Sequence, residues 1–297
     1  MTCGLDPPEC YFLGGGEIIR FVKKALRALS FGSKRKPFKV ISSGPHHSDF
    51  SEIIASETHN GVILMHEGVA IPSIIMRDKV RKSAVMAEDF ILEGQQAFWA
   101  IQDILVQNNV RVGHDIEIFE FGVGCGRIAR HFLRSQIGSF RGSDVDEQLT
   151  SWCSDVLSKK DARFSFFKNE YLPPLAVQES SIDILFSISV LTHMQKAAQD
   201  AWLREMSKPI KPGGHLLLSI IEDGEDQLPT GIQVRERIDE EYKREWLGVG
   251  DAPETYFSTA NTSRYITDIL KDNFQFVAGR SKAIRGRQSL LLFKKTI

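Results

Sequence analysis

The sequence predicts an α/β fold in which helices cover both faces of a parallel sheet. Three observations predict it. Strand-like and helix-like segments alternate between residues 116 and 221, a glycine-rich turn follows the first strand, and the fourth strand is predominantly apolar. Alternating strands and helices build a parallel sheet through right-handed crossovers, and a predominantly apolar strand is typical of one that is buried on both faces.

The first strand leads directly into a glycine-rich loop. The segment Ile116 to Arg127 reads IEIFEFGVGCGR and places the acidic Glu120 just before the loop. Three glycines alternate in it: Gly122, Gly124 and Gly126. Glycine lets the backbone turn sharply and approach a ligand, and the helix predicted from Ile128 to Leu133 would offer N–H groups to an anion. The loop therefore predicts a nucleotide-type cofactor site, with a purely structural turn as the alternative.

Arg127 distinguishes this loop from a dinucleotide-binding loop. The dinucleotide fingerprint G-x-G-x-x-G would need a glycine at the position that Arg127 occupies. This disfavours an NAD(P)-dependent oxidoreductase. A guanidinium can bind a ligand carboxylate in a bidentate manner, or it can pair with Glu120 or another acid, and we slightly favour the structural pairing.

The second strand, Phe140 to Ser143, ends at an acidic pair. Asp144 lies about 20 residues beyond the loop, where the second strand of a βαβ unit delivers a carboxylate to ribose hydroxyls. An ionised carboxylate accepts hydrogen bonds from both hydroxyls of a ribose diol. Helix capping is the alternative for Asp144 and the main role that we expect for Asp146.

Two further strands follow with polar residues at their ends. Phe164 to Lys168 ends at Asn169, and the buried strand Ile182 to Ile188 runs into Ser189, Thr192 and His193. A helix is predicted over Gln195 to Lys208 from its apolar spacing. A turn with the sequence KPGG, residues 211–214, then leads to a strand over His215 to Ile221.

This pattern resembles the class I S-adenosylmethionine-dependent methyltransferases, from the acidic-x-G-x-G-x-G motif to the KPGG turn. The resemblance covers about Phe90 to Lys295 and implies a Rossmann-like, mostly parallel sheet. Within it, the helix Arg264 to Lys271 and the strand Phe274 to Ala278 precede a last, antiparallel strand, Gln288 to Lys294. The SVLTH segment after strand four is similar to a bacterial branch with S-V-[FL]-T-H.

The resemblance implies S-adenosylmethionine as the cofactor and assigns residues to it. Asn169 would face the adenine, and the full set of cofactor-binding residues would be Glu120, Gly122, Gly124, Gly126, Asp144, Asn169 and Ser189. The implied reaction is methyl transfer to a small-molecule or saccharide acceptor, at oxygen. A catalytically silent partner subunit with the same fold is the second alternative.

His193 is the candidate general base. Transfer to a hydroxyl requires removal of its proton, and histidine has an unperturbed pKa suited to that task near neutrality. His193 follows strand four, close in sequence to where the transferred methyl should lie. A histidine that caps or packs against a helix is the alternative.

The rest of the chain is expected to surround this core. We predict an N-terminal helical extension over residues 1–71 and a methyltransferase domain over 72–297, with helical spacing in Pro72 to Val110. An insertion over 222–262, helical near Val234 to Trp246, would form a substrate lid or a solvated surface excursion. The basic amphipathic segment 17–36 would lie on an anionic membrane or pack on the domain.

Bulk composition narrows the class of protein. The 297 residues carry a formal net charge of −1, which disfavours a nucleic-acid binder. The four cysteines have no spacing typical of zinc, so no metal site is predicted. No apolar run reaches the roughly 18 residues of a membrane span and no signal peptide is visible, so a cytoplasmic location is expected. The sequence does not indicate an oligomeric state.

Overall fold

Two compact units make up the chain, Met1–Phe90 and Ile91–Ile297. The computed structural model describes residues 39–40, 53–58, 61–80, 86–221, 234–238 and 257–296. The predicted basic amphipathic segment 17–36 lies outside the described residues, and the predicted boundary between residues 71 and 72 stays a prediction. Among the described helices, none is both long and apolar enough to cross a bilayer.

The first unit contains a small antiparallel sheet that the sequence analysis did not predict. Its strands are ordered β1-β2-β3-β4, with the bounds β1 Lys39–Val40, β2 Ile53–Thr58, β3 Gly61–His66 and β4 Val69–Ala70. Glu67 and Gly68 both have positive φ, 54° and 71°, as the two-residue turn between β3 and β4 requires. The helix α2, Ile74–Val80, follows. The extension is therefore not helical throughout, and its short apolar runs separated by N-G and E-G pairs were the missed signal.

The second unit is built on a seven-stranded sheet ordered β12-β13-β9-β8-β5-β6-β7. The parallel strands are β5 Glu117–Phe121, β6 Ser139–Asp144, β7 Phe164–Lys168, β8 Ile182–Ser187 and β9 Ile210–Ile221. The last strand, β13 Gln288–Lys295, pairs antiparallel with both β9 and β12, Phe274–Ile284. This confirms the predicted Rossmann-like sheet with an inserted antiparallel strand.

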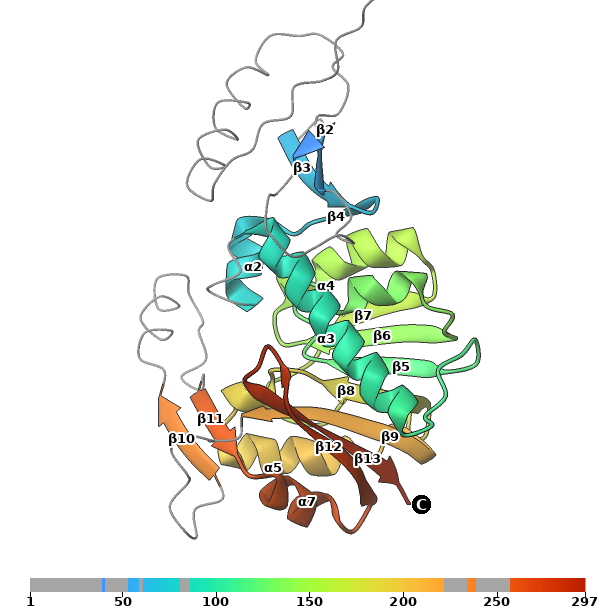
Figure 1. The fold of residues 1–297 in the computed structure, drawn as a ribbon, viewed down its shortest axis with the longest axis vertical. Coiled ribbons are helices and arrows are strands. Elements are labelled where there is room, and N and C mark those ends of the chain that lie inside the picture. The colour runs from blue at the N-terminus through green and yellow to red at the C-terminus, as the bar shows by residue number, and fades with distance from the viewer. Residues whose placement is uncertain are drawn as a thin grey trace, which may run out of the picture. The chain divides into compact units, whose positions relative to one another are not determined.

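Helices pack on both faces of this sheet, as predicted. The helix α3, Ala87–Gln107, crosses one face (Figure 1). There Phe98 meets Phe132 edge-on, with ring centroids 4.9 Å apart. The helices α5, Lys196–Glu205, and α7, Ser263–Leu270, contribute Trp202 and Ile266 to a separate cluster with strand residues such as Phe119.

Two segments differ from their predicted conformation. The KPGG residues 211–214 lie inside β9, at a register shift opposite β8, because Gly213 with φ of 76° lets the strand bulge instead of turning. The segment Val234–Ile238 is a strand, β10, and not part of a helix. Its residues pair in antiparallel register with β11, Phe257–Asn261. Residues 239–256 lie outside the described part of the chain.

Candidate functional site

The ends of β5, β6, β7 and β8 meet at one edge of the sheet. These strands are parallel neighbours, so the segments that follow them converge, and ligands of open α/β sheets bind at this edge. The loop after β5 carries the glycines, and Asp144 ends β6. Asn169 follows β7, and Ser189 follows β8. The predicted site residues are therefore gathered at one edge.

The glycine loop needs glycine for two separate reasons. Gly122, Gly124 and Gly126 have φ of 79°, 54° and 74°, a region that side chains with a Cβ disfavour. A Cβ on Gly122 would also overlap Cγ2 of Val190 in the loop after β8. The loop is held against β6, because the N–H groups of Gly122 and Val123 both donate to the Ser143 carbonyl, at 2.8 and 2.9 Å.

The helix behind the loop differs from the prediction. The segment η1, Ala129–Arg134, is a 3₁₀ helix of 6 residues, where a longer helix was predicted to begin at Ile128. A short 3₁₀ segment does not build up the aligned dipole of a long α-helix. The donors of this region are consequently individual N–H groups and the side chain of Arg127, and an anion site at a helix N-terminus is not formed.

Asp144 and Asp146 have distinct positions. Asp144 Oδ2 accepts a hydrogen bond from the N–H of Gly124 at 2.8 Å, and its Oδ1 accepts one from the N–H of Asp146 at 3.0 Å. Asp146 caps the helix α4, Glu147–Cys153, by accepting from the N–H groups of Gln148 and Leu149 at 2.9 and 3.3 Å. Burial raises the pKa of Asp144, and its bonds to backbone N–H groups oppose this. Asp146 is therefore the residue that caps α4, and Asp144 is not.

Glu120 and Arg127 are two buried residues of opposite charge beside the loop. Glu120 is 3% exposed and Arg127 is 8% exposed. Burial raises the pKa of Glu120 well above its usual value, although the charge of Arg127 opposes the rise. Burial likewise lowers the pKa of Arg127, with Glu120 opposing. Glu120 Oε2 and the Nε and Nη1 atoms of Arg127 are buried without a hydrogen-bond partner, although buried polar groups are normally satisfied.

The raised pKa of Glu120 predicts a pH-dependent stability. Between the ordinary pKa of 4.5 and the raised value, the folded state keeps the proton that the unfolded state has lost. The free energy of unfolding should therefore fall as the pH rises through this window, by about 1.4 kcal/mol for each unit of raised pKa. Glu120→Gln removes the titrating group, so its stability should fall less between pH 5 and pH 8. Chemical denaturation at several pH values measures this.

The exposed Glu147→Gln variant is the matched control for that measurement, since the Glu147 side chain lies at the surface of α4. It should follow the wild-type pH profile. If Glu120→Gln also runs parallel to the wild type, Glu120 is ionised in the folded protein and the assigned burial effect is wrong.

Asn169 is also buried at this edge, at 6% exposure. Its Nδ2 donates to the Glu170 carbonyl at 2.7 Å, and its backbone N–H donates to the Asp144 carbonyl at 3.0 Å. Its Oδ1 has no hydrogen-bond partner. An acceptor oxygen is thus available beside Asp144.

Ser189 belongs to a polar network that the sequence analysis missed. Its backbone has φ of 63°, which is unusual for a residue with a Cβ. Ser219 Oγ accepts from the N–H of Ser189 at 2.7 Å and donates to Gln288 Oε1 at 2.8 Å, while Gln288 Nε2 donates to Ser189 Oγ at 2.9 Å. The network joins the ends of β8, β9 and β13. A serine inside the otherwise apolar run of β9 was the available signal.

His193 lies in η3, Leu191–His193, the short 3₁₀ helix that follows β8. The side chain of His193 is half-buried, and the backbone N–H of His193 donates to the Val190 carbonyl at 2.9 Å. The segment is fixed from behind by Gln199, whose Nε2 donates to the carbonyls of Leu191 and Met194 at 3.0 and 2.9 Å. His193 is thereby held on the same edge as Ser189.

The return strand of the insertion is fastened to this segment. Thr259 Oγ1 donates to the Met194 carbonyl at 2.7 Å, and Asn261 Nδ2 donates to Gln199 Oε1 at 2.9 Å. Thr259, Asn261 and Gln199 are fully buried, so these bonds are shielded from water and costly to break. The sequence analysis identified none of the three, because their importance comes from contacts between distant segments.

The comparison with family models identifies a domain in this part of the chain. Residues 118–214, about a third of the chain from β5 into β9, match the model of a family described as "Methyltransferase domain". Similar solved structures include magnesium protoporphyrin IX methyltransferase from Synechocystis with bound S-adenosylhomocysteine, at 15% identity over 71% of this chain and 87% of that chain, with a TM-score of 0.49.

Two others are methyltransferases described as dependent on S-adenosylmethionine. The one from Methanosarcina mazei is 16% identical over 65% of this chain and 97% of that chain, with a TM-score of 0.48. The one from Mesorhizobium loti is 15% identical over 66% and 98%, with a TM-score of 0.47.

Proposed function

We propose that this S-adenosylmethionine-dependent methyltransferase transfers a methyl group to an oxygen atom of a small-molecule or glycan-type acceptor in the cytoplasm. The chain is an enzyme of this class and S-adenosylmethionine is its cofactor, because residues 118–214 match a methyltransferase domain and the sheet order and glycine loop agree with that match. The observation that carries the proposal is the convergence of the glycine loop, Asp144 and the His193 segment at one sheet edge. We also propose that the protein belongs to the bacterial branch of these methyltransferases that carries S-V-[FL]-T-H after strand four, because its own segment there reads SVLTH.

The residues at this edge suit the cofactor. Buried atoms without partners on Arg127, Asn169 and Glu120 mark places where a polar ligand would complete the hydrogen bonding. We assign Asp144 to the ribose hydroxyls and Asn169 Oδ1 to the adenine amine. The unpaired donors of Arg127 now favour the methionine carboxylate over a purely structural role. We also assign Ser189, Glu120 and the three glycines of the loop to cofactor binding.

The acceptor side of the site is assigned to the His193 segment and the insertion. When bound, the cofactor supplies an electrophilic methyl group on a sulfonium. The tasks of the protein are then to align the acceptor, to exclude water and to accept the acceptor's proton. The buried bonds of Thr259 and Asn261 attach β11 to the segment that carries His193. This attachment supports the lid interpretation of the insertion 222–262, and His193 is the proposed base.

Neither alternative function gains support. Arg127 stands where a dinucleotide-binding loop needs glycine. A silent partner subunit would not require a positive-φ glycine loop with an acidic strand end beside it.

His193→Ala should lower the rate of methyl transfer by about 100-fold or more, because general-base catalysis contributes that much. Its affinity for S-adenosylhomocysteine should stay unchanged. Wild type is first titrated calorimetrically with S-adenosylhomocysteine and, separately, with NAD. Hydroxylated acceptors are then screened by release of S-adenosylhomocysteine, and the rate of the variant is measured with the acceptor found.

The exposed His114→Ala variant is the control, and it should turn over like the wild type. Full activity of His193→Ala would remove the base assignment. Binding of NAD in place of S-adenosylhomocysteine would overturn the cofactor site, and a product methylated at nitrogen would overturn the oxygen acceptor.

A further inference from the structure

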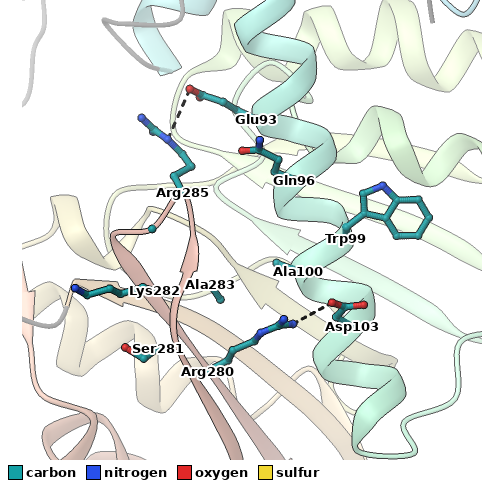
Figure 2. A pocket seen from close by; sticks show the side chains of 11 residues that line it. Glu93, Gln96, Trp99, Ala100, Asp103, Arg280, Ser281, Lys282, Ala283 and Arg285 are labelled. Atoms are coloured by element: carbon teal, nitrogen blue, oxygen red, sulfur yellow. Dashed lines mark hydrogen bonds and ion pairs between the residues drawn. The ribbon is translucent and has the colours of Figure 1, made fainter. Parts of the chain in front are cut away.

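A groove outside the cofactor edge lies between α3 and the hairpin formed by β12 and β13. Its hollow measures about 810 Å³, within the size range of small-molecule sites. On the helix, Glu93, Gln96, Ala100 and Asp103 share one face, since they are three or four residues apart. On the hairpin side, residues 280–283, 285 and 286 line the groove (Figure 2).

Two ion pairs span the groove. Arg280 Nη1 lies 3.0 Å from Asp103 Oδ2, and Arg285 Nε lies 3.6 Å from Glu93 Oε1. Figure 2 shows Ala100 and Ala283 between the two pairs, whereas Lys282 points away from α3. The small alanine side chains leave the centre open. The groove therefore presents two guanidinium groups and two carboxylates around an open middle.

The balance of charge indicates the kind of ligand. An anion would meet the repulsion of Glu93 and Asp103, and a cation would meet that of Arg280 and Arg285. A neutral ligand with many hydroxyls avoids both penalties, because carboxylates accept hydrogen bonds from hydroxyls and a guanidinium has five N–H groups to donate. The pair of Arg280 and Asp103 is accessible, with side chains 43% and 55% exposed.

Trp99 lies at the margin of the groove, and Figure 2 shows its ring on the side of α3 that faces away from the hairpin. Its side chain is 58% exposed, and its ring meets that of Phe98 edge-on at 5.2 Å. A single exposed tryptophan needs no explanation by itself. Beside hydrogen-bonding groups, however, the negative face of an indole attracts the polarised C–H groups of a sugar ring.

The groove also adjoins the proposed acceptor side. Gly286 lines the groove, and two residues later Gln288 hydrogen-bonds to Ser189. Two residues of chain span at most about 7 Å. On α3, Gly94 follows Glu93 directly, and a Cβ on Gly94 would overlap the Arg127 carbonyl of the cofactor loop. Each wall of the groove therefore lies close to residues of the proposed active site.

We propose that the groove between α3 and the β12–β13 hairpin binds a neutral pyranose ring of a saccharide acceptor. This inference rests on the proposed function and names its substrate class. The sugar ring lies at the end of the groove beside Trp99, and the ion pair of Arg280 with Asp103 exchanges hydrogen bonds with its hydroxyls.

The test follows the indole N–H signals of isotopically labelled full-length protein by nuclear magnetic resonance. The Trp99→Phe variant identifies the Trp99 signal by its loss. The probes are the methyl pyranosides of glucose, mannose and galactose, and N-acetylglucosamine, each up to about 10 mM, because a single ring should bind in the millimolar range. Inorganic phosphate is the charged comparison.

We expect a saturable shift of the Trp99 signal with at least one sugar and none with phosphate. Arg280→Gln should weaken sugar binding by about tenfold. Val106→Ala, which changes an exposed residue of α3 that does not line the groove, should leave it unchanged. A response to phosphate alone, or no response to any sugar, would overturn the proposal, as would equal binding by Arg280→Gln.

Calorimetric titration of the same samples with S-adenosylhomocysteine separates the two proposals. Cofactor binding without a sugar response contradicts the groove assignment alone. A sugar response without cofactor binding contradicts the proposed function and leaves a saccharide-binding groove.

Discussion

Asp144→Ala is expected to weaken binding of S-adenosylhomocysteine by about 100-fold or more. A carboxylate that accepts from both ribose hydroxyls contributes two charge-assisted hydrogen bonds, each worth about 1.5–3 kcal/mol, and about 2.8 kcal/mol corresponds to 100-fold in affinity. Asp144 also receives the Gly124 N–H at 2.8 Å, so its loss releases the middle of the glycine loop. Calorimetric titration of the purified variant measures the effect.

Asp146→Ala is the matched control, because it removes a carboxylate two residues away that has a different function. Asp146 caps α4 through the N–H groups of Gln148 and Leu149, so the variant should lose about 1 kcal/mol of stability and keep its affinity. If the two variants lose affinity equally, the effect comes from local disruption, and the ribose role of Asp144 is wrong.

Gly122→Ala should destabilise the fold by about 3 kcal/mol and abolish measurable cofactor binding. The φ of 79° alone costs a residue with a Cβ about 1–2 kcal/mol. The overlap with Val190 adds the cost of overpacking, about 1–3 kcal/mol. Relief of that overlap would displace the loop that begins at Ser189. Chemical denaturation and calorimetric titration measure the two effects.

Gly213→Ala separates the two contributions. Gly213 has nearly the same φ, 76°, but no atom lies within 4 Å of an added Cβ. The Gly213→Ala variant should therefore lose only the stability that a positive φ costs a residue with a Cβ, about 1–2 kcal/mol. In the Gly122→Ala background, Val190→Ala should recover part of the lost stability, which a double-mutant cycle measures. Equal losses for Gly122→Ala and Gly213→Ala, or no recovery, would contradict the close approach of the two loops.

The close approach of Gly122 to Val190 means that the cofactor loop and the His193 segment are packed together. The Ser189, Ser219 and Gln288 network continues this coupling to the β12–β13 hairpin. A change at Gln288 can thus reach the loop that begins at Ser189 through hydrogen bonds.

The sequence by itself determined the strands β5 to β9 and the set of polar residues at the strand ends, whereas the antiparallel insertion of β13 was implied only by the resemblance to a known family. These features depend on local signals. Apolar periodicity fixes which segments are strands, and the spacing of Gly122, Gly124 and Gly126 before Asp144 reflects the fixed geometry of a βαβ unit. Such signals are readable without knowledge of distant contacts.

Tertiary structure alone decided the remaining features. Val234–Ile238 forms a strand because β11 pairs with it, and residues 211–214 lie inside β9 as a bulge between Ile210 and His215, both of which pair with β8. The bonds of Gln199 to Asn261 and of Ser189 to Gln288 join residues far apart in the chain. The groove at Trp99 requires α3 and the hairpin to lie side by side. Local propensity is worth less than 1 kcal/mol per residue, so pairing and burial between distant segments decide such positions.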